Sequence, residues 1–198
     1  HRDRATGQLA GLDRGEGQRV GGPGGFDPGG FQRLAGFGGA RPGQVLLLFT
    51  RDAGRNVANA LRDLKTESTD LKGVLLDLRG NGGGLLREAI NVCNVFITAE
   101  ETVVTTRSKV VEADQEYKTR TEPVDTEIEL IVLIDENSAS ASEIVSGVMQ
   151  DLDRGVIIGQ LSYGKGLVQN TFDIGYNAKV KLTTSKYYIP SGRCIQSV

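Results

Sequence analysis

Residues 73–86 read Gly73-Val-Leu-Leu-Asp-Leu-Arg-Gly-Asn-Gly-Gly-Gly-Leu-Leu86. A continuous apolar run of this length, broken by glycines, is typical of a buried strand that ends in a tight turn. The pattern then changes to helical spacing as far as Phe96, and we expect inward-facing side chains at Leu86, Ala89, Ile90 and Cys93. The stretch therefore predicts a strand, a turn and a helix in succession.

The same alternation continues on both sides of this unit. Before it, residues 45–49 predict a buried strand and Asp52 starts a helix, whose apolar positions are Val57, Ala60, Leu61 and Leu64. After it come hairpins over 101–127, a buried strand over 128–134, a helix over about 139–150, a strand over 156–159 and strand-like segments over 167–172 and 178–189. We expect a layered α/β domain with a largely parallel sheet and additional β-hairpins.

Composition excludes several classes of protein. The chain has 198 residues and a net charge of -2, with 23 basic and 25 acidic residues interspersed, so no basic stripe suggests nucleic acid as a partner. The spacing of Cys93 and Cys194 fits neither a zinc site nor a dithiol motif. No apolar run reaches the roughly 18 residues of a membrane span.

Residues 1–44 differ from the rest of the chain. They contain 14 of the 27 glycines, three of the five prolines and six arginines, but no Lys, Ile, Asn, Ser or Tyr. Such a segment has little to bury and much backbone entropy to lose on folding. It is a Gly-rich linker, a degraded piece of a preceding domain, or a non-native segment.

A serine-rich turn is the first candidate for chemistry. Ser138, Ser140 and Ser142 fall where the strand over 128–134 gives way to a helix, a position that offers unpaired N–H groups and the positive end of the helix dipole. This placement suits a nucleophile whose attack creates an oxyanion. The same serines also suit a helix cap, with Ser138 as the N-cap, and packing.

A lysine is the candidate base, because the only histidine is His1 at the end of the chain. Lys165 follows a predicted strand and lies between Gly164 and Gly166. Glycines on both sides let another backbone approach closely and desolvate the amine, which favours its neutral, proton-accepting form. A solvated lysine in a turn is the alternative, and Gln169 taken alone would be a surface residue.

The glycine cluster Gly80–Gly84 also opens a helix. It does not fit a phosphate-binding motif, because Leu85 stands where the third glycine of G-x-G-x-x-G would fall and no G-K-[ST] follows. Adjacent glycines can instead present N–H groups to a developing negative charge. An oxyanion-hole loop and a plain tight turn both remain open.

Taken together, these pieces resemble the carboxyl-terminal processing peptidases, or tail-specific proteases, a family of serine endopeptidases. The matching segments are Leu75–Leu86, Asn137–Ile144, Gln150-Asp151 with Arg154, Tyr163–Gly166 with Gln169, and Leu182–Thr184 with Tyr187–Arg193. They cover residues 45–198 in the family's order.

The resemblance implies a role for each site residue. Ser140 matches the nucleophile, Lys165 the general base and Gln169 the glutamine that positions the lysine. The oxyanion hole would combine the backbone N–H of Ala141 with that of Gly83 or Gly84. The family's core is related to the ClpP and crotonase folds, and its Ser/Lys dyad needs no metal or cofactor.

The resemblance also sets expectations for the whole protein. Residues 45–198 would be a peptidase catalytic core, truncated at its C-terminal end, and residues 1–44 lack the pattern of the family's PDZ domain. Substrates would be proteins or peptides with accessible C-termini, the location periplasmic or cell envelope, and a homo-oligomer is compatible with the family. A non-proteolytic binding protein on the same fold is the alternative, although Ser140, Lys165 and Gln169 together argue against it.

Overall fold

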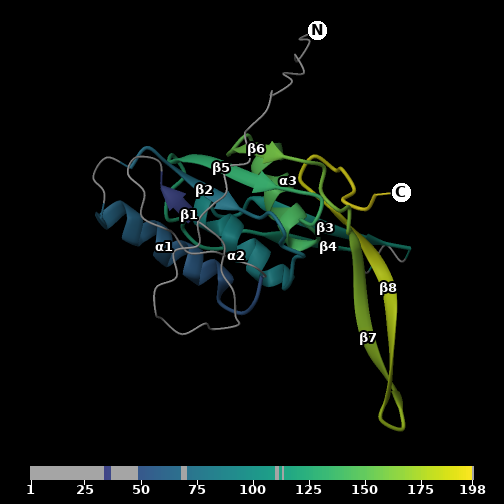
Figure 1. The fold of residues 1–198 in the computed structure, drawn as a ribbon. Helices are drawn as coiled ribbons and strands as arrows, with labels where there is room; N and C mark the ends of the chain where they lie inside the picture. The colour runs from purple at the N-terminus through teal and green to yellow at the C-terminus, as the bar shows by residue number, and fades with distance from the viewer. Residues whose placement is uncertain (1–33, 37–48, 68–70, 110–111, 113, 198) are drawn as a thin grey trace, which may run out of the picture.

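The computed structural model describes residues 34–36, 49–67, 71–109, 112 and 114–197, which form a mixed α/β fold with two sheets (Figure 1). Most of the segment 1–44 and of the strand expected over 45–49 lies outside the described residues. The described part of residues 1–44 is the short strand β1 (Leu34–Gly36).

The first sheet has the order β1-β2-β5-β6. Strands β2 (Gly73–Asp77), β5 (Glu129–Ile134) and β6 (Val156–Gly159) run parallel to one another, whereas β1 is antiparallel to β2. The carboxyl ends of β2 and β5 therefore lie at the same edge of the sheet, which is where open α/β sheets place their sites. The glycine loop after β2 and the serine-rich turn after β5 meet there.

Three helices form the core together with this sheet: α1 (Ala53–Glu67), α2 (Leu86–Phe96) and α3 (Ala141–Asp151). Helix α2 packs against both α1 and α3. Their apolar stripes are buried, as at Leu61, Phe96 and Ile144, which are at most 1% exposed. Burial of each such side chain stabilises the fold by about 1.5–3 kcal/mol.

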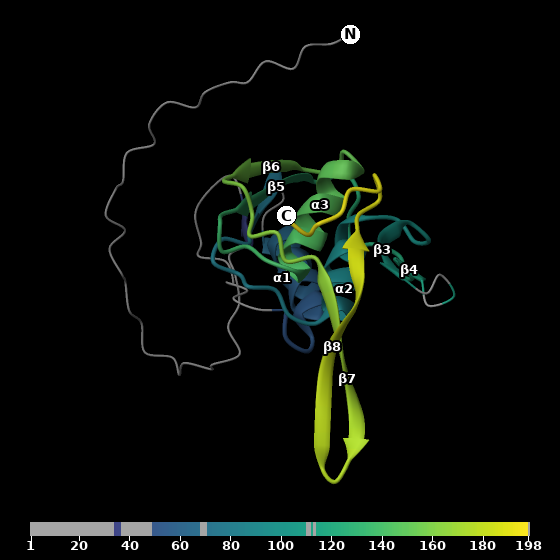
Figure 2. The ribbon, with the colours of Figure 1, turned by 90° about the vertical axis from the view of Figure 1, so that its right-hand side faces the viewer.

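The second sheet is antiparallel and has the order β4-β3-β8-β7. It consists of β3 (Thr102–Ser108), β4 (Gln115–Lys118), β7 (Leu167–Gly175) and β8 (Ala178–Tyr188). Strands β7 and β8 form a long hairpin that extends away from the helices (Figures 1 and 2). Its turn contains Tyr176 and Asn177, both with positive φ, as a two-residue hairpin turn requires.

The expected α/β fold with parallel strands is confirmed, and among the named strands of the described residues the parallel pairs are β2 with β5 and β5 with β6. The expected hairpins are present and join into a sheet of their own because β3 pairs with β8. None of the helices in the described ranges has the length and apolarity to cross a membrane. Among the same residues, no group of three or more His, Cys, Asp or Glu side chains is arranged to hold a metal ion.

Candidate active site

Ser140 caps the N-terminus of α3 in an unusual backbone conformation. Its φ of 55° and ψ of -111° lie outside the regions that non-glycine residues normally occupy. Such strain persists only where the surroundings hold the residue in place, and it is common at functional sites. The N-cap is thus Ser140, and the alternative that Ser138 is the N-cap was wrong.

Ser138 has a structural role in the preceding turn. Its hydroxyl donates to the carbonyl of Leu78 at 2.7 Å and accepts from the backbone nitrogen of Asp135 at 2.9 Å. The carboxylate of Asp135 accepts from the backbone nitrogens of Gly80 at 2.9 Å and Asn137 at 3.0 Å. These bonds join the ends of β2 and β5 and fix the turn that leads to Ser140.

Burial alone would raise the pKa of Asp135, but the hydrogen bonds from Gly80, Asn137 and Ser138 outweigh it and hold the pKa below its usual value. The carboxylate is therefore stabilised in its charged form. On the other side of the loop, Arg79 donates two hydrogen bonds to Asp77, at 2.8 and 2.7 Å. This bond to Asp77 is the main reason that the pKa of Arg79 is raised.

The glycine loop lies directly against Ser140. A Cβ atom on Gly83 would lie 2.8 Å from the Cβ of Ser140 and 2.9 Å from the backbone nitrogen of Ala141, and the φ of Gly83 is +96°. Asn81 attaches the loop to the start of α3. Its buried backbone carbonyl accepts hydrogen bonds from the backbone nitrogen of Ala139 and the hydroxyl of Ser142, both at 2.9 Å. A side chain at position 83 would therefore displace the start of α3.

The backbone donors near Ser140 differ in their availability. The N–H of Gly83 donates to the side-chain oxygen of Asn81 at 2.8 Å. The Gly83 carbonyl accepts from Phe49, so the next N–H, that of Gly84, points away from Phe49. Within the described part of the chain, neither the Gly84 N–H nor that of Ala141, the first residue of α3, has an acceptor.

Glu143 links the serine turn to the lysine loop. The residue is 5% exposed, and its carboxylate accepts four hydrogen bonds of 2.6–2.8 Å. The donors are the backbone nitrogens of Ser140, Gly164 and Lys165 and the hydroxyl of Ser162. Sequence reasoning assigned no role to Glu143, although its spacing from Ser140 is the S-x-x-E of a capping box and was the available signal.

The last described residues pack on both sides of Lys165. A Cβ on Gly164 would lie 2.4 Å from the Cβ of Ser197, and one on Gly166 would lie 2.2 Å from the backbone nitrogen of Gln196. The Gly166 N–H donates to the Gln196 side chain at 3.0 Å, and the Ser197 N–H donates to the Gly164 carbonyl at 3.1 Å. The close backbone approach expected at these glycines is confirmed.

The side chains of the expected dyad are not hydrogen-bonded to each other. Lys165 is exposed, so the expected desolvation of its amine by that backbone is not seen. Gln169 is exposed on β7, opposite Thr183. Among the described residues, the Lys165 amine has no hydrogen bond to Ser140 or Gln169. The backbones of Ser140 and Lys165 are brought together through Glu143, and Gln169 stands apart.

Comparison with known proteins gives this arrangement a context. Residues 33–198 match the family described as Peptidase family S41. A carboxy-terminal-processing protease of Bartonella bacilliformis is 42% identical over 155 residues, covering 77% of this chain and 36% of the relative. A carboxyl-terminal-processing protease of Synechocystis sp. is 37% identical over 142 residues, covering 72% of this chain and 32% of the relative. The chain thus spans about a third of the length of these relatives.

A solved structure gives the same result. The photosystem II D1 C-terminal processing protease superposes with a TM-score of 0.70 and 29% sequence identity, over 76% of this chain and 38% of that protein. The resemblance inferred from the sequence motifs is thereby confirmed. The chain belongs to peptidase family S41.

Proposed function

We propose that this chain carries the catalytic site of a serine endopeptidase that cleaves protein substrates near their C-termini through a Ser140/Lys165 dyad. The observation that carries the proposal is the shared carboxylate of Glu143, which joins the backbones of Ser140 and Lys165. Names of relatives support the position of cleavage, since they are described as carboxy-terminal-processing proteases. We further propose that the core is layered like the ClpP and crotonase folds.

In the first step, the Ser140 hydroxyl attacks the carbonyl carbon of the scissile peptide bond while the neutral amine of Lys165 accepts its proton. Catalytic hydrogen bonds are often long without substrate and tighten when it binds, so the exposed Lys165 side chain is free to turn toward Ser140. A substrate lying over the lysine would also exclude water, which favours the neutral amine. Gln169 would position the lysine from β7.

The tetrahedral intermediate carries its negative charge on the former carbonyl oxygen. We assign the Ala141 and Gly84 N–H groups as its donors, because the Gly83 N–H is already bonded to Asn81. The start of α3 adds the positive end of a helix dipole. A single oxyanion donor contributes about 3–4 kcal/mol to transition-state stabilisation in a serine peptidase.

The intermediate collapses when the carbon–nitrogen bond breaks and protonated Lys165 gives its proton to the leaving amine. Ser140 then carries the acyl group as an ester. Water, deprotonated by the same lysine, attacks the ester and releases the new carboxyl terminus and the free serine. Apart from the substrate and this water, both steps use only side chains and backbone groups of the chain.

The cellular location and the oligomeric state of the protein are also proposed from its family. We also propose a periplasmic or cell-envelope location. The substrates would then be proteins and peptides of that compartment with accessible C-termini. A homo-oligomer is consistent with this function. The proposal also includes residues 45–198 as the catalytic core of a longer protein.

Labelling with a fluorophosphonate, followed by peptide mapping, tests the nucleophile. We expect label on Ser140 of the parent and none in Ser140→Ala, while Ser191→Ala, which changes an exposed serine that is not bonded to Glu143, keeps it. Cleavage of an unfolded protein with an apolar C-terminus should disappear in Ser140→Ala and Lys165→Ala, and remain in Lys181→Ala, which changes an exposed lysine of the hairpin. Cleavage that persists in both dyad variants, with circular dichroism unchanged, would reject the dyad.

A further inference from the structure

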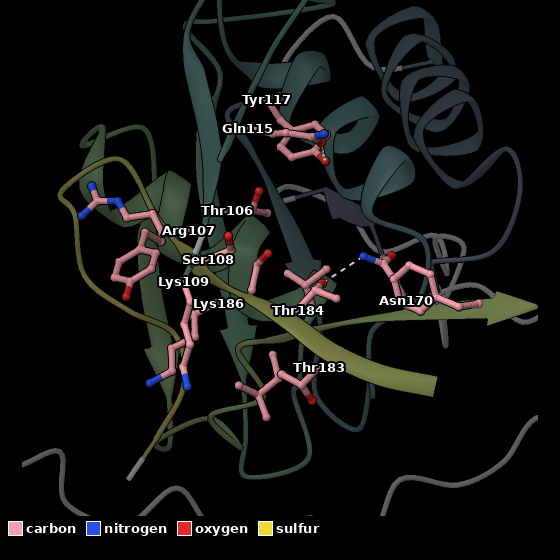
Figure 3. A pocket seen from close by; sticks show the side chains of 15 residues that line it. Thr106, Arg107, Ser108, Lys109, Gln115, Tyr117, Asn170, Thr183, Thr184 and Lys186 are labelled. Carbon is pink, nitrogen blue, oxygen red and sulfur yellow. Dashed lines mark hydrogen bonds between the residues drawn. The ribbon is translucent and has the colours of Figure 1, made fainter. Parts of the chain in front are cut away.

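A groove lies on the second sheet, between the β3–β4 pair and the base of the β7–β8 hairpin (Figure 3). Its volume is about 1020 Å³. Cationic side chains line it at Arg107, Lys109 and Lys186, and apolar or aromatic ones at Leu167, Phe172 and Tyr188. Hydroxyl and amide groups such as Thr184 and Asn170, which are hydrogen-bonded to each other at 2.9 Å, complete the lining.

The charged side chains that line this groove are all cationic. No Asp or Glu occurs among its described lining residues, although the chain as a whole carries a net charge of -2. Arg107 on β3 and Lys186 on β8 are direct cross-strand partners. Like charges in that position repel each other. Neither they nor Lys109 has an ion-pair partner in the described ranges. The Arg107 guanidinium lies over the ring of Tyr188, 4.6 Å from its centroid, and Figure 3 shows it turned away from the ends of the lysine side chains.

The groove begins next to the proposed base. Its lining residues Leu167 and Val168 follow Gly166, which follows Lys165. The carbonyl of Gly166 accepts from the backbone nitrogen of Tyr187 at 2.8 Å, between the lining residues Lys186 and Tyr188. A chain bound at Ser140 and Lys165 therefore needs only a few further residues to enter the groove.

The structure points to an extended, acidic peptide segment of the substrate as the ligand of this groove, and this inference rests on the proposed peptidase function. Carboxylates of the segment would pair with the cationic side chains of Arg107, Lys109 and Lys186, since charge complementarity selects a partner. Among the described residues, β7 has β8 as its only strand partner, so its outer edge is open to backbone pairing with an extended peptide. The groove then selects substrates that are acidic beside the scissile bond.

Binding to the Ser140→Ala chain tests this inference without cleavage. The probes are three fluorescent peptides with the same apolar C-terminus: one with several Asp and Glu residues, its Asn and Gln counterpart, and a Lys counterpart. A single-stranded oligonucleotide of the same charge as the acidic peptide is a fourth. We expect the acidic peptide to bind about tenfold more tightly than the neutral one at low salt, and the advantage to fall as salt rises.

The groove variant replaces Arg107, Lys109 and Lys186 with Gln. The matched control replaces three exposed arginines outside the groove lining, Arg55, Arg62 and Arg120, with Gln and changes the net charge equally. The acidic peptide should lose its advantage in the groove variant and keep it in the control. Should the groove variant unfold, Lys186→Gln alone serves, because it changes one exposed side chain and leaves the stacking of Arg107 on Tyr188 in place.

Equal binding of acidic and neutral peptides, no binding of either, equal loss in the control variant, or tighter binding of the oligonucleotide would each overturn the inference. A separate cleavage assay on the parent keeps the two proposals apart. If the binding contrast is present but Ser140 is neither labelled nor needed for cleavage, the groove stands and the peptidase mechanism fails. If cleavage depends on both dyad residues but ignores peptide charge, the mechanism stands and the groove inference fails.

Discussion

Ser140 and Lys165 share one hydrogen-bond acceptor, because the carboxylate of Glu143 lies 2.7 Å from the backbone nitrogen of Ser140 and 2.8 Å from that of Lys165. Both bonds end on the same oxygen, Oε2, so a single atom sets the spacing between the backbones of the nucleophile and the base. Hydrogen bonds to a buried charged group contribute about 1.5–3 kcal/mol each, so the link is strong on the scale of one fold's stability.

We expect Glu143→Gln to lower kcat by about 100-fold while KM changes little, because a small displacement of a catalytic pair costs about that much and substrate contacts are unaffected. The amide keeps one acceptor oxygen, so the fold should survive, as thermal unfolding will check. Glu136→Gln is the control, since Glu136 is an exposed carboxylate in the turn that precedes α3. A Glu143→Gln enzyme with parental kcat would show that the carboxylate is not needed for positioning.

Alanine substitution should have very different effects on labelling and melting temperature at the neighbouring positions Gly83 and Gly82. Gly83→Ala places a methyl group 2.8 Å from the Cβ of Ser140 at a φ of +96°, so we expect loss of fluorophosphonate labelling and a lower melting temperature. At Gly82 the same methyl group meets nothing within 4 Å, and the φ of Gly82 is not positive. Gly82→Ala should therefore label and melt like the parent. Similar behaviour of both variants would mean that Gly83 does not lie against the nucleophile.

Gln196 offers a test of the contact between the last described residues and the lysine loop. Its side chain accepts from the Gly166 N–H at 3.0 Å, a bond worth about 0.5–1.5 kcal/mol. We expect Gln196→Ala to reduce kcat by about three- to tenfold, because the loop that carries Lys165 becomes less constrained. Gln160→Ala, at an exposed glutamine before the same loop, is the control. Equal kcat in the two variants would assign Gln196 no part in positioning.

Much of this fold could be predicted from the sequence because its strands and helices have strong local periodicity. The strand over 73–78 and the helices near 53, 86 and 141 lie where their apolar patterns predict. The joining of β3 to β8 could not be predicted, since it depends on pairing between distant segments whose alternation permits several partners.

The site also has features that could be predicted from the sequence and features that could not. The family resemblance implied that Gly83 or Gly84 lies beside the nucleophile's turn, and the fold explains this proximity because the two loops follow neighbouring parallel strands of one sheet. The role of Glu143 was missed because a glutamate in the first turn of a helix usually caps its own helix, and nothing local indicates that it also binds Gly164 and Lys165. The hydrogen bond from the Gly83 N–H to the Asn81 side chain was also missed, although an Asn that binds the backbone two residues on is a common local turn motif.

Acid should weaken the junction that Asp135 makes between β2 and β5. Its pKa in the folded protein is lowered, so its contribution to stability is present above the unfolded value of about 3.9 and is lost as the pH falls through the lower, folded value. Asp135→Asn should therefore destabilise the protein at pH 7, and the difference from the parent should shrink below about pH 4. Urea unfolding at a series of pH values measures both quantities.

The control is Asp153→Asn, at an exposed position with a positive φ that Asn tolerates. Its stability should equal that of the parent at every pH. A stability difference for Asp135→Asn that stays constant from pH 7 to pH 3 would mean that the hydrogen bonds to Gly80 and Asn137 do not depend on the charge of the carboxylate.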